Sequence, residues 1–262
     1  MEFTILLGGG LARKIRQRFD PVLLVVSPPR SGSTALARAF WQHPAFRWYV
    51  HEPFDRAYHQ GGGGESVLTA MRDPIDVGDR CAGGLVLKEM TFQVGSRAGE
   101  LVAAASLPVV IALRDPRLAI ESRMRQRRRA GQEPSFPHNE SGWRDLVKIL
   151  DRLRAGRVPH VIVETTTLRA RPAHCLEALC ARLGIGYTPD MLDWPAASGM
   201  RLGQLASEQT HWYERVLRSR GFEPPTEALP GLDEFPPGMR AHVAECLEVY
   251  RTLVTDPWML RS

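Results

Sequence analysis

Residues 21–34 read PVLLVVSPPRSGST, and this stretch decides the fold. Its first half, residues 21–27, is a short apolar run without alternation, which is typical of a strand buried on both faces of a parallel sheet. A helix is expected to follow at about residues 33–42. Such a strand-to-helix junction directs several backbone N–H groups and the positive end of the helix dipole towards one anion.

The loop between these two elements has the composition of a phosphate-binding loop. Gly32 lets the backbone approach an anion closely, and Arg30 supplies a positive charge. Three hydroxyl groups add further hydrogen-bond donors: Ser31, Ser33 and Thr34. Compared with the G-x-x-x-x-G-K-[ST] loop, Ser27 replaces the first glycine and Ser33 replaces the lysine, so ATP or GTP hydrolysis is disfavoured. A Ser/Gly-rich turn into a helix is the alternative for the loop taken alone.

Similar apolar runs recur along the chain, at residues 47–50, 84–88, 109–113 and 161–164. Helices are expected between and after them, at residues 115–130, 141–155, 172–183, 207–220 and 237–253. This alternation predicts a single α/β domain with a P-loop-like, doubly wound, mainly parallel sheet and helices on both faces. We expect the motif-bearing core at residues 21–184 and an α-helical C-terminal extension at residues 185–262.

Composition narrows the class of protein without choosing a ligand. The 262 residues carry a net charge of +5, which suits nucleic acid, acidic carriers or phosphorylated small molecules equally well. The apolar run at residues 3–7 is too short for a signal peptide, and no stretch approaches the ~20 apolar residues that span a bilayer. The cysteines lack C-x-x-C spacing. We therefore expect reduced thiols in a cytoplasmic protein, without a metal site.

A second strand-to-helix junction lies at residues 109–117, with the sequence VVIALRDPR. Arg114 falls at the carboxyl end of the apolar strand, where open α/β sheets bind ligands, and Ser122 lies on the following helix. Arginine can bind a phosphate through two parallel hydrogen bonds, and serine adds a third. Taken alone, the motif is better explained as a helix cap with a surface ion pair.

Together the two motifs resemble those of sulfotransferases that use 3′-phosphoadenosine-5′-phosphosulfate (PAPS). PRSGST is similar to the family's 5′-phosphosulfate loop, and Arg114 with Ser122 is similar to its 3′-phosphate motif. The resemblance covers about residues 21–184 and implies transfer of a sulfuryl group to a hydroxyl or amine of a small-molecule acceptor, without a metal. It implies these donor-binding residues: Arg30, Ser31, Gly32, Ser33, Thr34, Arg114 and Ser122.

Lys88 ends the apolar run at residues 84–88, so it should lie at the same edge of the sheet. It resembles the lysine that sulfotransferases carry after their third strand. The resemblance implies that Lys88 neutralises charge on the transferring sulfuryl group and the leaving oxygen, a task that Arg30 could share. An edge lysine with its amine in solvent is the alternative.

The general base is sought at the end of the second strand, where residues 48–54 read WYVHEPF. Several sulfotransferases with similar loops use a glutamate at about this point, whereas the cytosolic type uses a histidine that is missing after Lys88 here. We therefore favour Glu52 as the base, ahead of His51 and then Glu89. Alternation puts His51 and Glu52 on opposite faces unless the strand has already ended, and Glu52 could instead cap or salt-bridge.

The chain departs from the family pattern at three places. Thr165, Thr166 and Thr167 replace a Tyr-Glu-Asp triplet, and Ala35 replaces an aromatic residue after the phosphosulfate loop. The family's late glycine-rich 3′-phosphate loop is not recognisable. How the adenine is held therefore stays open.

Two other functions are compatible with the same motifs. One is a P-loop kinase of a small molecule, for which Asp115 is a poor candidate for the magnesium ligand. Ser33, which stands where a P-loop has its lysine, argues against the kinase. A nucleotide- or nucleic-acid-binding module would use the arginines of residues 123–129, but no interleaved aromatics accompany them. We expect a small-molecule acceptor, no nucleic acid and no membrane partner. Three aromatic residues are candidates for an acceptor pocket: His138, Trp212 and Tyr213.

Overall fold

The structure is a computed structural model that describes residues 3–6, 10–61, 65–70, 83–196 and 206–261. Its strands are β1 (Phe3–Leu6), β2 (Val22–Ser27), β3 (Phe46–His51), β4 (Glu65–Ala70), β5 (Gly84–Met90), β6 (Val109–Leu113) and β7 (His160–Glu164). Its α-helices are α1 (Leu11–Arg18), α2 (Ser33–Gln42), α3 (Asp55–Gln60), α4 (Thr91–Val94), α5 (Ala98–Ala104), α6 (Pro116–Arg129), α7 (Trp143–Ala155), α8 (Thr165–Ala170), α9 (Pro172–Leu183), α10 (Ala206–Arg218) and α11 (Pro237–Val254).

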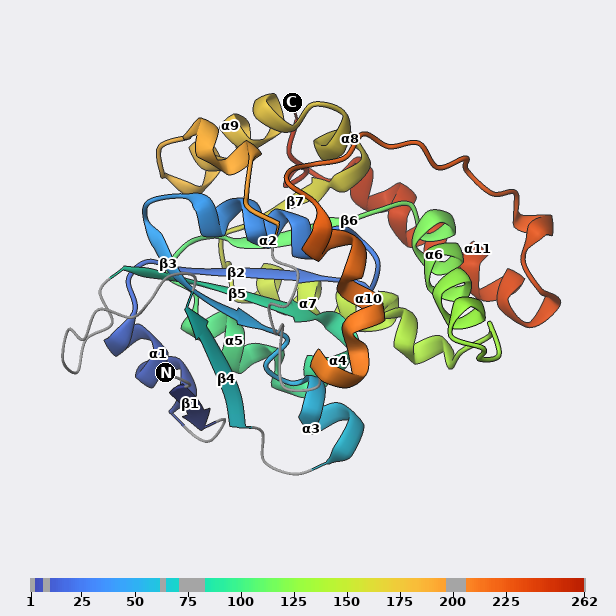
Figure 1. The fold of residues 1–262 in the computed structure, drawn as a ribbon, viewed down its shortest axis with the longest axis horizontal. Helices are drawn as coiled ribbons and strands as arrows, with labels where there is room; N and C mark the ends of the chain where they lie inside the picture. Colours follow the sequence, from blue (N-terminus) through green and yellow to red (C-terminus); the bar gives the residue numbers. More distant parts are fainter. Residues whose placement is uncertain (1–2, 7–9, 62–64, 71–82, 197–205, 262) are drawn as a thin grey trace.

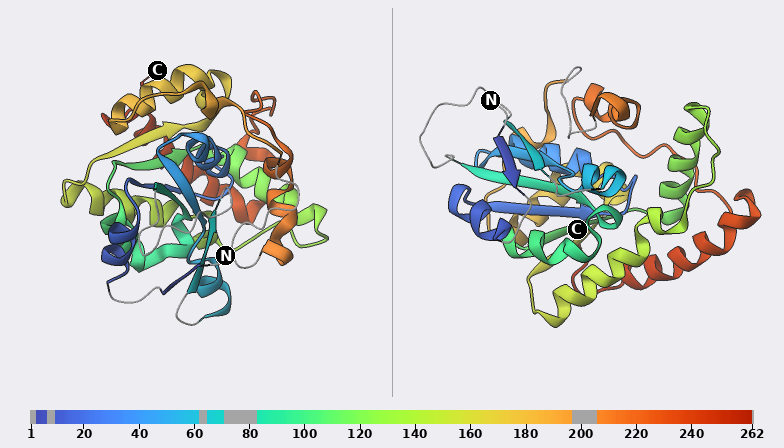
Figure 2. Two further views of the ribbon diagram at one scale, coloured as in Figure 1. Left: turned by 60° about the vertical axis from the view of Figure 1, so that its left-hand side comes forward. Right: turned by 90° about the horizontal axis from the view of Figure 1, so that it is seen from below.

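The sheet has the order β1-β4-β3-β5-β2-β6-β7, and helices lie on both of its faces (Figures 1 and 2). The strands from β3 to β7 in this order are parallel, whereas β4 pairs antiparallel with β3 and with β1. The predicted α/β fold with a mainly parallel sheet is confirmed. Because β2 lies between β5 and β6, the loop after β2 is flanked by the ends of both neighbours.

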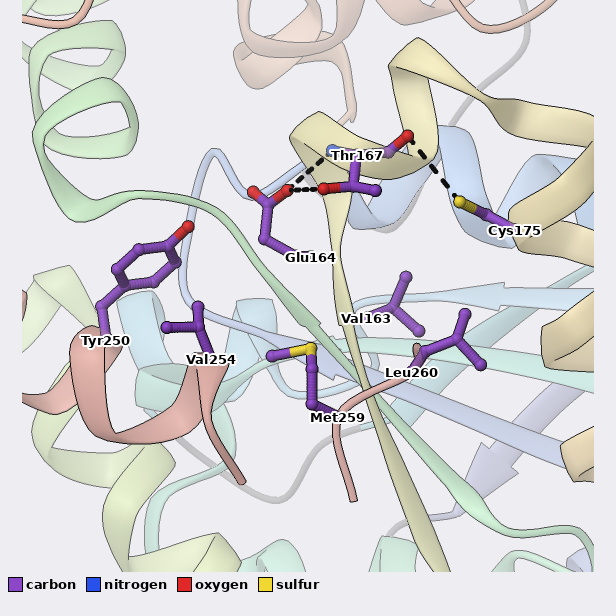
Figure 3. Close-up of a pocket in the computed structure, with 8 residues that line it drawn as sticks. All are labelled: Val163, Glu164, Thr167, Cys175, Tyr250, Val254, Met259 and Leu260. Atoms are coloured by element: carbon purple, nitrogen blue, oxygen red, sulfur yellow. Dashed lines mark hydrogen bonds between the residues drawn. The ribbon is translucent and has the colours of Figure 1, made fainter. Parts of the chain in front are cut away.

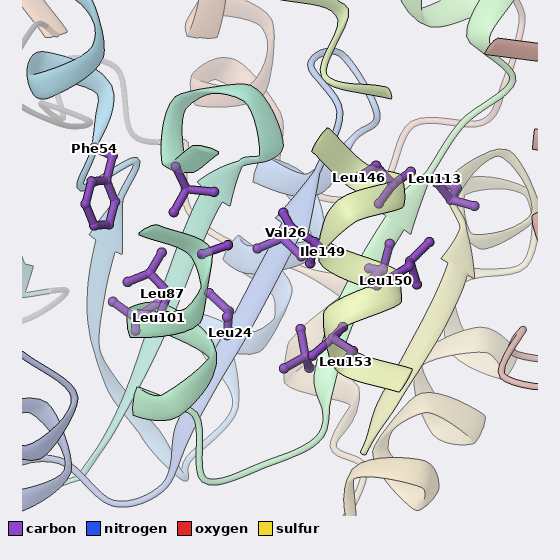
Figure 4. Packing of buried hydrophobic residues seen from close by; sticks show 14 of the residues in the cluster. Leu24, Val26, Phe54, Leu87, Leu101, Leu113, Leu146, Ile149, Leu150 and Leu153 are labelled. Carbon is purple, nitrogen blue, oxygen red and sulfur yellow. The ribbon is translucent and has the colours of Figure 1, made fainter. Parts of the chain in front are cut away.

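The side chains of β2 alternate between two buried clusters. Leu24 and Val26 pack with α5, α6, α7 and α11 on one face, as Figure 4 shows for part of this cluster. Leu23 and Val25 pack with α2, α9 and α10 on the other face. Burying one such leucine or valine contributes about 1.5–3 kcal/mol, so both helix layers are firmly attached to the central strand.

The motif-bearing helices match their predicted ranges closely. Both α2 and α9 begin and end where the sequence indicates, since Pro172 opens α9 and Gly184 closes it with a left-handed φ of 72°. The sequence did not predict β1, β4 or the short helices α1, α3, α4, α5 and α8. Two of these, β1 and β4, form the antiparallel edge of the sheet, where strand patterns are weakest.

The C-terminal residues return to the sheet beside β7. Ile162 donates its backbone N–H to Trp258 and accepts from Leu260, over 2.9 and 2.8 Å. Of the described part of the chain, no helix combines the length and apolar character that a bilayer crossing requires. The described cysteines, Cys175, Cys180 and Cys246, are free thiols, and Cys81 lies outside the described residues.

Candidate active site

The predicted phosphate-binding loop joins β2 to α2 at the carboxyl edge of the parallel strands. Arg30 and Gly32 both have left-handed backbone angles, with φ of 62° and 74°. The chain therefore bends sharply between strand and helix, at a cost of about 1–3 kcal/mol for the arginine. At the base of the loop the buried hydroxyl of Ser27 donates to that of Ser33 over 2.7 Å. This bond fixes both ends of the loop.

Ser31 and Gly32 form the inner surface of the loop. The hydroxyl of Ser31 is buried and has no hydrogen-bond partner among the described residues, which is rare unless a ligand or water completes it. A Cβ on Gly32 would lie 3.4 Å from the side chain of Thr165, and the Thr165 hydroxyl donates to the Leu113 carbonyl over 2.9 Å. Thr165, the first residue of the departing triplet, thus supports the loop, a role that the sequence analysis missed.

Gly32→Ala is expected to lower the free energy of unfolding by about 1–2 kcal/mol, because the alanine must adopt a left-handed φ against Thr165. This corresponds to a fall in Tm of about 2–8 °C. Gly186→Ala is the matched control, since its Cβ would meet nothing within 4 Å and its φ is not left-handed. Thermal melts of both variants test the prediction, and equal Tm values would contradict it.

The side chain of Arg30 reaches along the sheet edge to Ser122. Its Nε donates to the Ser122 hydroxyl over 3.2 Å, and a terminal nitrogen donates to the Trp212 carbonyl over 2.9 Å. Burial lowers the pKa of Arg30 to about 10, so the guanidinium stays charged at neutral pH. The contacts of Arg30 therefore lie with the predicted 3′-phosphate residues.

Arg114 directly follows β6 and lies on the same side of the loop as the contact between Arg30 and Ser122. The residue is 8% exposed, a terminal nitrogen lies 3.5 Å from the Arg30 carbonyl, and another lies 3.2 Å from Oε1 of Glu227. In the part of the chain that the structure describes, the buried Nε of Arg114 has no hydrogen-bond partner. Burial lowers the pKa of Arg114, and Glu227 partly offsets this shift. The structure thus brings Arg30, Ser122 and Arg114 together.

Glu52 and Lys88 form a buried ion pair on the other side of the loop. Residue 52 follows β3 and is 4% exposed, and the Nζ of Lys88 donates to its Oε1. Its second oxygen accepts from the Tyr213 hydroxyl over 2.9 Å and from Nε2 of Gln93 over 3.3 Å. Lys88 is 1% exposed, so the alternative of an edge lysine with its amine in solvent is wrong.

The charge state of Glu52 depends on this ion pair. Burial by itself would raise the pKa of the carboxyl, but the nearby charge of Lys88, followed by His51, holds the pKa well below its usual range. A carboxylate that is so strongly stabilised is a weak base. Glu52 can therefore accept a proton effectively only when Lys88 turns to another partner.

His51 lies beside Glu52 rather than on the opposite face of the sheet. Glu52 has a left-handed φ of 48°, so the strand has ended there and alternation no longer applies. Nε2 of His51 lies 3.1 Å from Oε1 of Glu52, and Nδ1 forms a 2.6 Å hydrogen bond with the Tyr49 hydroxyl. Burial lowers the pKa of His51, which the charge of Glu52 opposes.

Glu89, the third candidate for the base, is held by backbone groups. Its two oxygens accept from the N–H groups of Phe54 over 2.8 Å and Met90 over 2.6 Å. Burial, followed by the charge of Glu52, raises the pKa of Glu89 well above its usual range. These bonds tie β5 to the segment after β3, so Glu89 supports the site more than it faces an acceptor.

Three polar residues near Glu52 were not singled out in the sequence: Gln93, Asp55 and His59. Gln93 on α4 donates to Glu52 and also to Oδ1 of Asp55, over 2.6 Å in the second case. Nε2 of His59 lies 3.3 Å from the same Oδ1. Only the sharp turn from β5 into α4 brings Gln93 to this place, and the sequence carries no motif for it.

The chain is similar to known proteins both in part of its sequence and in its fold. A family model described as a sulfotransferase domain matches residues 148–239. The sulfotransferase domain from the curacin biosynthetic pathway superposes with a TM-score of 0.51 at 14% identity, over 89% of this chain and 98% of that one. The chain is sulfotransferase-like in fold, and in sequence over residues 148–239. The predicted resemblance to sulfotransferases is confirmed at the level of the fold and of residues 148–239, a range that overlaps the predicted residues 21–184 and extends beyond them.

Two further structures are similar to the sulfotransferase-like chain. The sulfotransferase domain from the Synechococcus PCC 7002 olefin synthase is 17% identical, with a TM-score of 0.49 over 89% of this chain and 95% of that one. The mouse sulfotransferase SULT7A1, complexed with PAP, is 12% identical, with a TM-score of 0.48 over 96% and 94%. No curated protein matches the sequence.

A cavity of about 320 Å³ in this sulfotransferase fold lies beyond the carboxyl end of β7 (Figure 3). Its lining consists of Val163, Glu164, Thr167, Cys175, Tyr250, Val254, Met259 and Leu260. None of the predicted site residues lines it. Glu164 is occupied in capping α8, where it accepts from the backbone of Thr166 and Thr167 over 3.1 and 2.6 Å. The cavity is thus separate from the loop and the ion pair.

Within the described ranges, no three His, Cys, Asp or Glu side chains are grouped so that they could hold a metal ion. The charges that face the loop come instead from arginine and lysine.

Proposed function

We propose that the chain transfers a sulfuryl group from PAPS to a hydroxyl or amine of a small-molecule acceptor. One observation carries this proposal: a phosphate loop lies between a buried arginine on one side and a buried lysine–glutamate pair on the other. The strand order β5-β2-β6 supports it, because Lys88 lies two residues before the end of β5, which is longer than predicted, and Arg114 directly follows β6, so the two residues lie on either side of β2. A donor with a phosphosulfate at one end and a 3′-phosphate at the other needs cations at two such places.

The residues of the loop side fit the anionic groups of PAPS. The Ser31 hydroxyl and the Nε of Arg114 are buried hydrogen-bond donors that find no partner within the described ranges. Gly32 allows the loop N–H groups to approach the phosphosulfate. Arg30 and Ser122 add further hydrogen-bonding groups on the side where the 3′-phosphate would bind. PAPS supplies an activated sulfuryl group when it binds.

In the proposed reaction, Glu52 takes the proton of the acceptor hydroxyl as the acceptor oxygen attacks sulfur. A bond forms between that oxygen and sulfur, while the bond from sulfur to the 5′-phosphate oxygen breaks with its electron pair on the phosphate. Lys88 and the loop N–H groups stabilise the negative charge on the departing oxygen and on the sulfuryl group. The products are the sulfated acceptor and adenosine 3′,5′-bisphosphate.

The ion pair supports an order of events within this reaction. Without the donor, Lys88 keeps Glu52 charged and weakly basic. If Lys88 turns to the bridging oxygen, burial is no longer opposed by that charge, and the pKa of Glu52 rises. The base then becomes effective once the donor is bound, which limits proton uptake to the productive complex.

Donor selectivity tests the proposal. Calorimetric titration of the protein with adenosine 3′,5′-bisphosphate is expected to show binding at least about 10-fold tighter than ATP with magnesium, because one charge-assisted contact to the 3′-phosphate is worth about 1.5–3 kcal/mol. Indifference to the 3′-phosphate would refute the sulfotransferase proposal. Preference for magnesium ATP with turnover to ADP would instead favour a small-molecule kinase.

A further inference from the structure

A carboxylate from the C-terminal part of the chain binds the arginine that should receive the donor. Oε1 of Glu227 lies 3.2 Å from a terminal nitrogen of Arg114 and 3.6 Å from one of Arg215. Oε2 of Glu227 lies 3.1 Å from a terminal nitrogen of Arg169. Three guanidinium groups from β6, α8 and α10 therefore meet at one side chain.

The segment that carries Glu227 connects α10 to α11 and passes α8 (Figure 1). Arg169 on α8 holds it by donating from Nε to the carbonyl of Glu223 over 2.8 Å and from a terminal nitrogen to that of Pro224 over 3.0 Å. These contacts place the Glu227 carboxylate, whose side chain is 16% exposed, at the border between the buried Arg114 and solvent.

The charges in this group do not balance. Glu223 pairs with Arg215 at 2.6 Å, so two carboxylates face three guanidinium groups and one positive charge is left over. Although Glu227 is in contact with the same guanidinium, the Nε of Arg114 remains buried and finds no hydrogen-bond acceptor among the residues that the structure describes. A carboxylate thus satisfies this site incompletely, whereas a phosphate dianion brings a second charge and a third oxygen.

We propose that Glu227 is an internal competitor for the 3′-phosphate of the donor. Its carboxylate binds Arg114 when the donor is absent, and the 3′-phosphate displaces it when the donor binds. The inference rests on the proposed function, because it takes Arg114 as the receptor of that phosphate. It predicts that the apparent donor affinity equals the intrinsic affinity reduced by the fraction of molecules in which Glu227 has left Arg114.

Removing the charge of Glu227 tests the inference. Glu227→Gln keeps an amide oxygen at the same place but weakens the hold on Arg114. We expect adenosine 3′,5′-bisphosphate to bind this variant about 3–30-fold tighter than the wild type. Adenosine 5′-phosphate, which lacks the 3′-phosphate, should bind both proteins equally. Glu223→Gln is the matched control: it removes a carboxylate from the same segment that pairs with Arg215 and not with Arg114, and it should leave both affinities unchanged.

Hydrogen exchange of the wild-type protein gives a second measurement that needs no variant. Bound adenosine 3′,5′-bisphosphate should slow amide exchange in residues 27–34. It should speed amide exchange in residues 223–228, because the Glu227 carboxylate no longer binds Arg114. Equal binding to the wild type and Glu227→Gln, with unchanged or slower exchange at residues 223–228, would overturn the inference alone. Failure of every variant and of the wild type to bind this nucleotide would overturn the proposed function.

Discussion

Glu52→Gln is expected to lower kcat by about 10²–10⁴-fold, the range that general bases contribute. The glutamine keeps the shape of the side chain and can still accept a hydrogen bond from Tyr213, but it cannot take the acceptor's proton. Affinity for adenosine 3′,5′-bisphosphate should stay within a few fold of the wild type, because the Glu52 carboxylate binds Lys88, Tyr213 and Gln93, which lie outside the loop. Release of this nucleotide from PAPS, measured with a panel of phenols, alcohols and amines, gives the rate.

The control for this prediction must separate catalysis from folding. Removing one member of a buried ion pair costs about 3–5 kcal/mol, since Lys88 is left without a counter-charge. Glu52→Gln combined with Lys88→Met removes both charges and should recover most of that stability without recovering activity. Glu89→Gln, which alters a carboxyl held by backbone groups, should keep far more activity than Glu52→Gln. Full activity of Glu52→Gln would show that another group, with His51 first, is the base.

The same ion pair makes stability depend on pH. Because the pKa of Glu52 is lower in the folded protein than in the unfolded chain, its contribution is complete above the unfolded value of about 4.3. That contribution is lost as the pH falls through the lower folded value. Lowering the pH from 5 to 3 should therefore reduce the free energy of unfolding more in the wild type than in the Glu52→Gln and Lys88→Met double variant. Urea denaturation at each pH measures this free energy.

Arg114→Ala is expected to weaken binding of adenosine 3′,5′-bisphosphate by about 10–100-fold, the loss of one charge-assisted, two-point contact. Adenosine 5′-phosphate should lose almost nothing, so the difference between the two nucleotides reports on the 3′-phosphate. Arg117→Ala is the control from the same junction, because its guanidinium pairs with Asp115 at 2.8 Å. An equal loss for both nucleotides would mean that Arg114 supports the fold of the site instead of binding the phosphate.

The sequence predicted those parts of the molecule that follow local rules. The strand at residues 22–27 and the helix from Ser33 to Gln42 come from hydrophobic runs and a loop composition that need no tertiary context. The end of β6 and the N-cap by Asp115, which accepts from the backbone of Arg117 over 2.9 Å, follow from the same kind of pattern. The predicted donor and catalytic residues therefore fall at one edge of the sheet.

The parts that the sequence did not predict depend on long-range packing. Gln93 reaches Glu52 only after a turn, and Tyr213 reaches it from 161 positions away in the chain. Glu227 lies in a proline-rich connector without a motif, and its three arginine partners are spread over β6, α8 and α10. Strand alternation also could not predict whether His51 and Glu52 lie on the same face of the sheet, because the left-handed φ of Glu52 ends the strand there.

Two consecutive residues of α10 hold the two halves of the site: the Trp212 carbonyl accepts from Arg30, and the Tyr213 hydroxyl donates to Glu52. Each residue of a helix is rotated by about 100° from the one before it. An insertion or deletion of one residue in α10 upstream of Trp212 would therefore turn both contacts away at once. The helix therefore sets the position of Arg30, proposed to bind the nucleotide, relative to Glu52, the proposed base. We expect insertions and deletions to be tolerated far less in α10 than in the connector that follows it.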